Sequence, residues 1–131
     1  MSESHYDCPC MEKCPLHHAM QLIGGKWKVQ ILCAVCSAGA IRYNALRSKL
    51  DGVSNTVLSS ALRELERDGL VTRKEYLEVP VRVEYSPTDS CRELLPILEQ
   101  LSDWALKFFN FFELLHKLLI FLLFQQYMLN V

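Results

Sequence analysis

The segment 54–88 constrains the fold most, because it combines an amphipathic helix with two short strands that follow it directly. Ser54 can accept a backbone N–H bond as the N-cap of the helix. Apolar residues then recur at helical spacing, at Val57, Leu58, Ala61, Leu62 and Leu65. One face of this helix is therefore expected to pack against a core.

Two strands are predicted after this helix. A helix stop occurs at Asp68-Gly69, and the segment 70–76 has the pattern of a strand. Apolar and charged residues alternate in 81–85, which predicts a second strand joined to the first by a turn at 77–80. A helix followed by such a hairpin is typical of a winged helix, so we predict a mainly α fold with a small β-hairpin wing.

The outward face of the helix carries short hydrogen-bonding side chains and one cation, namely Asn55, Thr56, Ser59, Ser60 and Arg63. Such side chains can reach base edges and phosphates in a major groove of DNA. Every amphipathic surface helix has a polar face, however, so a merely solvated surface is the alternative. The hairpin adds Arg73, Lys74 and Arg82. An arginine near its tip can contact phosphates or a minor groove, unless these charges serve only solubility.

Three helices are predicted upstream. Pro15 begins the first and Gly24-Gly25 ends it, and the third follows Arg42, Tyr43 and Asn44. Side chains and backbone N–H groups at a helix entrance can hold a phosphate, which would position the protein on DNA. Asn44 is equally suited to be an ordinary helix cap.

Five motifs occur in a fixed order along residues 14–105. They are Cys14-Pro15-Leu16, Ile23-Gly24-Gly25-Lys26-Trp27, Arg42-Tyr43-Asn44-Ala45-Leu46, the segment 54–70 that ends in ELERDGL, and VPVRVEYSPT. In this set the chain resembles regulators of the HxlR type, a branch of the MarR-like winged helix-turn-helix transcription factors. The resemblance implies a homodimer, joined through its N- and C-terminal helices. It also implies that helix 54–67 enters the major groove of a double-stranded DNA operator, flanked by the wing.

The resemblance and the surface pattern together predict the DNA-binding residues. These are Arg42, Tyr43, Asn44, Ser54, Asn55, Thr56, Ser59, Ser60, Arg63, Arg73, Lys74 and Arg82. Relatives often carry further Arg or Lys in the recognition helix, whereas this chain has Thr56, Ser60 and Ala61 there. Arg63 is then the main cation of that helix. Since fewer cations make fewer phosphate contacts, binding is expected to rely on dimerisation.

Charge gives DNA binding only mild support. The 131 residues suit a single folded domain, but their net charge is −1, whereas a nonspecific nucleic-acid binder is usually plainly basic. Residues 42–82 carry eight Arg and Lys against six Asp and Glu. A winged-helix protein-interaction module without specific DNA binding is therefore the alternative function.

Six cysteines without a secretory leader indicate a reducing compartment, so we expect a cytoplasmic protein with thiols rather than structural disulfides. Three of them cluster ahead of the first helix, namely Cys8, Cys10 and Cys14. Nearby Lys13, His17 and His18 and the helix N-terminus favour a thiolate at Cys14, the form that oxidants and electrophiles attack. The resemblance implies sensing of a thiol-reactive small molecule through intersubunit disulfides or adducts. We predict redox sensing by this cluster, with no function as the alternative.

No strong metal or catalytic motif is present. The pattern C-x-C-x₃-C at 8–14 lacks the paired spacing of structural zinc sites, so a metal site with nearby histidines is the weaker alternative, and we predict no metal and no cofactor. Cys33 and Cys36 form C-x-x-C within an apolar helix and are interpreted as buried small hydrophobes. Cys91 has no partner visible in the sequence. Phosphate-binding glycine loops, zinc-protease motifs and nucleophile elbows are absent, so we predict no enzyme.

A final helix is predicted from 87–89 onward, with Pro96 either kinking it or shifting its start. Its apolar stripe consists of Leu94, Leu95, Ile97, Leu98, Leu101, Trp104 and Ala105. Residues 106–131 are rich in Leu and aromatic residues, but charged residues interrupt them, so a membrane span is not expected. Extended dimer packing is the first interpretation of this extension, a membrane-surface helix the second, and no selected role the third.

These patterns divide the chain into three parts. Residues 1–14 form an N-terminal cysteine-rich arm, residues 15–105 the winged helix-turn-helix domain, and residues 106–131 a hydrophobic helical extension that we expect to serve dimerisation.

Overall fold

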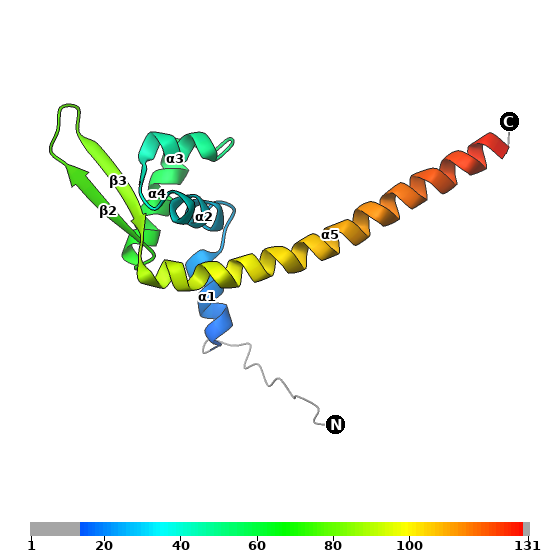
Figure 1. Cartoon of the computed structure of the whole chain (residues 1–131), viewed down its shortest axis with the longest axis horizontal. Coiled ribbons are helices and arrows are strands. Elements are labelled where there is room, and N and C mark those ends of the chain that lie inside the picture. Colours follow the sequence, from blue (N-terminus) through cyan, green and yellow to red (C-terminus); the bar gives the residue numbers. More distant parts are fainter. Residues whose placement is uncertain (1–13, 130–131) are drawn as a thin grey trace, which may run out of the picture. The chain divides into compact units, whose positions relative to one another are not determined.

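The computed structural model describes residues 14–129, which fall into two compact units that divide after Glu93 (Figure 1). Eight elements follow in chain order: α1 (Pro15–Ile23), α2 (Lys28–Ala38), β1 (Ile41–Arg42), α3 (Tyr43–Lys49), α4 (Asn55–Arg67), β2 (Val71–Tyr76), β3 (Arg82–Pro87) and α5 (Asp89–Leu129). The described residues are thus mainly helical, with a winged helix-turn-helix in the first unit, as the sequence predicted.

The wing differs from the predicted hairpin because it contains a third strand. The sheet is antiparallel in the order β1-β3-β2, and Tyr85 of β3 is paired with Ile41 on one side and Arg73 on the other. β3 also begins one residue later than expected and continues to Pro87, so Val81 belongs to the loop. The two-residue β1 was missed since a strand this short has no periodicity of its own.

The core of the first unit lies where α2, α3, α4 and the sheet meet. Its fully buried side chains include Ile31, Leu32, Val35, Leu46, Leu58, Leu62, Leu65 and Val71. The predicted apolar face of α4 is confirmed at Leu58, Ala61, Leu62 and Leu65. Val57 departs from the prediction, because it lies at the edge of that face and remains 43% exposed.

Both ends of α4 follow the predicted local chemistry. The Ser54 hydroxyl accepts the backbone N–H of Val57 at 3.2 Å, which confirms Ser54 as the N-cap. At the other end Gly69 has φ +79°, and Leu70 donates its N–H to the Leu65 carbonyl at 2.9 Å. Glycine suits this left-handed position, and the bond satisfies a terminal carbonyl of the helix. The length and direction of α4 are therefore fixed locally.

α5 begins at Asp89 and continues through Pro96, so the proline does not shift its start. The Thr88 hydroxyl caps its first turn by accepting the Cys91 N–H at 3.2 Å, and it donates to the Gly69 carbonyl at 2.7 Å. In the second unit, every large apolar side chain from Phe108 to Phe124 is at least 43% exposed. None of the described helices combines the length and the apolar character that crossing a membrane requires.

Candidate nucleic-acid interface

A hydrogen-bond cluster fixes the first turn of α4 against α3. The Tyr43 hydroxyl lies 2.9 Å from Asn55 Oδ1 and 3.3 Å from the Asn55 carbonyl, and 3.2 Å from the Ser59 hydroxyl. The phenol donates to Asn55, while either hydroxyl can donate in the pair with Ser59. Three residues predicted separately from the sequence therefore meet at one point, where they orient the helix that carries the polar face.

α2 supports the opposite side of α4. Lys28 Nζ lies 2.7 Å from Glu64 Oε2, and this hydrogen bond and charge hold the pKa of the Glu64 carboxyl below its usual value. Tyr43 of α3 and Lys28 of α2 thus both fix the position of α4. The outward face of α4 therefore has a defined orientation.

That outward face is open to solvent at Asn55, Thr56, Ser60 and Arg63, whereas Ser59 is half-buried. Ser54 is exposed as a residue, but its hydroxyl is occupied as the helix cap. Within residues 14–129, no carboxylate oxygen lies within 4.0 Å of the Arg63 guanidinium. Arg63 is therefore a solvent-facing cation whose donors remain available to an anion.

A pocket of about 440 Å³ joins α4 to the base of the wing. Its walls are Ser59, Arg63, Glu66, Arg73 and Tyr85. A hydrogen bond from Arg73 to Tyr85 raises the pKa of the guanidinium, and Glu75 lies 3.5 Å from Arg73. Two predicted cations from separate elements, Arg63 and Arg73, thus border one concave surface.

The cations of the wing are held by their own neighbours. Arg82 lies 3.3 Å from Glu78 and 3.7 Å from Glu84, and its guanidinium stacks 3.9 Å from the centre of the Tyr76 ring. Lys74 Nζ lies 4.8 Å from the same ring. The side chain of Arg82 is only 25% exposed, at the start of β3. Contact with DNA would require this arginine to exchange at least part of its carboxylate pairing.

The entrance of α3 places Arg42 and Asn44 in the open. Arg42 occupies the N-cap position without a side-chain cap bond, so the alternative that Asn44 caps the helix is wrong. Both residues line a pocket of about 590 Å³ that reaches the wing loop and the first two residues of β3, at 78–83. Their side chains are available as phosphate donors beside the wing.

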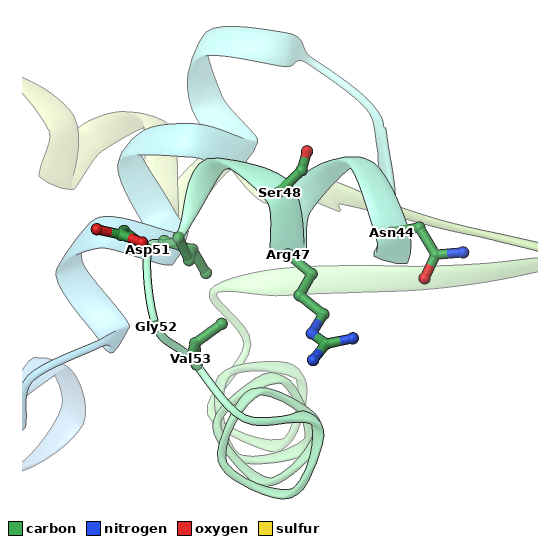
Figure 2. A pocket seen from close by; sticks show the side chains of 7 residues that line it. Asn44, Arg47, Ser48, Asp51, Gly52 and Val53 are labelled. Atoms are coloured by element: carbon green, nitrogen blue, oxygen red, sulfur yellow. The ribbon is translucent and has the colours of Figure 1, made fainter.

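Arg47 is a candidate contact that the site prediction omitted. It lines a pocket of about 500 Å³ formed by α3 and the turn into α4, together with Asn44, Ser48, Leu50, Asp51, Gly52 and Val53. Figure 2 shows its guanidinium extending from α3 on the side of Asn44. The spacing Asn44-x-x-Arg47, one turn of helix, was the available signal.

The cysteines fall into two groups. Cys14 is the N-cap residue of α1 and is buried, with 5% exposure, while Cys8 and Cys10 lie outside the described residues. Cys33 and Cys36 are half-buried within α2, and Cys91 is buried. No partner of Cys91 is visible in the sequence, but in the structure its Sγ lies 3.1 Å from Cys36 Sγ. Residues 14–129 contain no cluster of three His, Cys, Asp or Glu side chains arranged to hold a metal ion.

Known proteins resemble this chain in both sequence and fold. A family model described as HxlR-like helix-turn-helix matches residues 22–111. An HTH-type transcriptional regulator of Halalkalibacterium halodurans, BH0655, is 47% identical over 93 residues, which are 71% of this chain and 82% of the relative. Its function is uncharacterized.

Two solved structures are also similar. The redox regulator HypR in its oxidized form has a TM-score of 0.66 at 38% identity, covering 72% of this chain and 96% of HypR. The reduced form of the transcriptional regulator YodB from B. subtilis has a TM-score of 0.64 at 28% identity, covering 70% of this chain and 90% of YodB.

Proposed function

Because this chain belongs to the HxlR-like helix-turn-helix family of transcriptional regulators, we propose that it acts as a homodimer on a specific DNA operator, with α4 as its reading helix. The family consists of regulators and not of enzymes, in line with the prediction from the sequence. The observation that carries the proposal is the exposed polar face of α4, with Arg63 available, on a helix fixed by Tyr43 and Lys28.

In the proposed complex, α4 lies in the major groove. Asn55, Thr56 and Ser60 offer hydrogen bonds to base edges, and Arg63 offers a bidentate donor to guanine or a charge to phosphate. The phosphate backbone of the DNA is held at the start and end of α3 by Arg42, Asn44 and Arg47. Arg73, Lys74 and Arg82 face the adjoining groove from the wing. Two copies would read half-sites about one helical turn apart.

The proposed dimer is supported by the surface of α5. A single copy leaves thirteen large apolar side chains exposed between Phe108 and Phe124, a density that monomers rarely tolerate in water. Trp104, Phe108 and Phe112 form a column, with ring centres 5.9 Å and 4.8 Å apart. We infer that residues 106–131 extend the interface made by the N- and C-terminal helices.

Sedimentation of the full chain at micromolar concentration is expected to give a dimer. A triple variant in which Phe108, Phe111 and Phe112 are each replaced by serine should associate at least tenfold more weakly, because apolar area is lost from the interface. Replacing the three exposed serines Ser37, Ser48 and Ser60 with alanine is the control. A wild-type chain that sediments as a monomer would contradict the dimer.

We also propose that oxidation of Cys14 modulates DNA binding. Cys14 lies at the N-terminus of α1, where the helix dipole favours a thiolate, and the similar proteins HypR and YodB were solved in defined redox states. A bond or adduct formed by Cys14, with Cys8 or Cys10 as further reactive positions, would shift the angle between the two reading helices.

The test is fluorescence anisotropy with labelled DNA from the region upstream of the coding sequence, at two salt concentrations, before and after diamide. We expect salt-dependent binding at least 1,000-fold tighter than to scrambled DNA and a diamide response that Cys14→Ser removes and Cys33→Ser keeps. A Cys14→Ser protein with the wild-type response would exclude Cys14. Equal binding to all sequences across genomic fragments would favour the protein-interaction module instead.

A further inference from the structure

Cys36 on α2 and Cys91 in the first turn of α5 bring their sulfur atoms within 3.1 Å of each other, across 55 positions of sequence. Both residues belong to the first unit. We propose that they form a reversible dithiol–disulfide couple, an intrachain redox site separate from Cys14.

The two sulfur atoms need to move only a short distance to form a disulfide. A disulfide is about 2 Å long, so the sulfurs must approach by about 1 Å. Cys36 is on a helix that contacts β3, and Cys91 lies in the first turn of α5, where it donates its N–H to the Thr88 hydroxyl. Rotation of the two side chains can supply much of this approach while both helices stay in place.

The two thiols differ in access to solvent. Cys91 is 1% exposed, whereas Cys36 is half-buried. Burial, followed by the hydrogen bond to Cys36, raises the pKa of Cys91 to about 12. Cys91 therefore stays protonated at neutral pH, and a dissolved oxidant meets the sulfur of Cys36 first.

The chemistry balances with a peroxide as oxidant. Cys36–SH and ROOH give the sulfenic acid Cys36–SOH and ROH; the Cys91 sulfur then attacks Cys36–SOH, loses its proton, and releases water as the S–S bond forms. The two thiols lose two electrons and two protons in total, and the peroxide is reduced. A dithiol reductant reverses the reaction by thiol–disulfide exchange.

The new bond would act at the junction between the end of α4 and the start of α5. Thr88 connects the start of α5 to the end of α4, through its hydroxyl bond to the Gly69 carbonyl and its N–H bond to the Leu70 carbonyl. A Cys36–Cys91 disulfide adds α2 to this junction covalently. The redox state of the Cys36–Cys91 pair would thereby change how firmly α2, α4 and α5 are joined within one chain.

Peptide mapping of the native full-length protein tests this directly. The reduced protein is treated with hydrogen peroxide, remaining thiols are alkylated, and the chain is digested with trypsin. We expect peptide 29–42, which contains Cys33 and Cys36, linked to peptide 83–92, which contains Cys91. Reduction should release both peptides.

Cys33→Ser is the matched control, because Cys33 lies one turn earlier on the same helix. The linked pair should persist in Cys33→Ser and disappear in Cys36→Ser. Two results on the wild-type protein would overturn the proposal without relying on any variant: an internal Cys33–Cys36 bond, or recovery of both peptides unlinked after peroxide has oxidised Cys36. Neither depends on DNA binding, so the outcome is independent of the proposed operator.

Discussion

Replacing Leu62 with alanine is expected to lower the free energy of unfolding by about 2–5 kcal/mol, the range for a buried leucine truncation. Leu62 is 1% exposed at the centre of the buried face of α4. Removing its isobutyl group loses apolar burial and leaves a cavity that the surrounding helices can fill only in part. A domain of this size has a total stability of about 5–15 kcal/mol, so the loss is a large share.

The measurement is urea unfolding followed by circular dichroism, at a fixed protomer concentration because dimerisation contributes to stability. Val57→Ala on the same helix is the control. Val57 is 43% exposed, so its truncation should cost below about 1 kcal/mol. Equal losses for both variants would contradict the assignment of the core face.

The helical part of the first unit could be predicted because its signals are local. Ser54 and Gly69 mark the ends of α4 through bonds within one turn, and the apolar spacing between them sets the buried face. Pro15 is the first residue of α1 and Gly24 follows its last residue, as expected from their own backbone preferences. Local chemistry of this kind does not depend on the rest of the fold.

The strand β1 and the end of β3 could not be predicted in this way. Ile41 and Arg42 become a strand only because Tyr85 and Glu84 pair with them, more than forty residues later. Their own sequence contains too few residues for alternation. The third strand of the wing therefore depends on distant pairing, whereas the β2–β3 hairpin and each helix follow largely from their own segments.

The candidate site shows the same division. Sequence could identify polar and charged residues of α4 and the wing, but their pairings depend on the fold. Arg82 and Arg63 are both arginines in predicted contact positions, yet two carboxylates surround Arg82, whereas none of the described residues pairs with Arg63 through a carboxylate. Likewise, the sequence shows no partner for Cys91, and only the fold places Cys36 of α2 beside it.

This difference between the arginines gives the second major prediction. Arg63→Ala is expected to weaken binding to the specific operator about 10- to 100-fold, the range for an arginine that contacts a base or a phosphate. The guanidinium is solvent-exposed on the outward face of α4 and borders the pocket shared with Arg73. It can turn toward DNA without first breaking an ion pair with a described residue.

Arg67→Ala is the matched control, because it removes the same charge from the last turn of the same helix. The Arg67 Nε lies 3.2 Å from Asp68 Oδ1, so this arginine is already paired. Its removal should change operator affinity less than about threefold, as expected of a paired surface charge. Titrations at several salt concentrations identify the contact. If Arg63 neutralises a phosphate, the salt slope falls by about one in Arg63→Ala; if it reads a base, discrimination against scrambled DNA falls instead. Similar effects of the two variants would mean that α4 attracts DNA through overall charge rather than through Arg63.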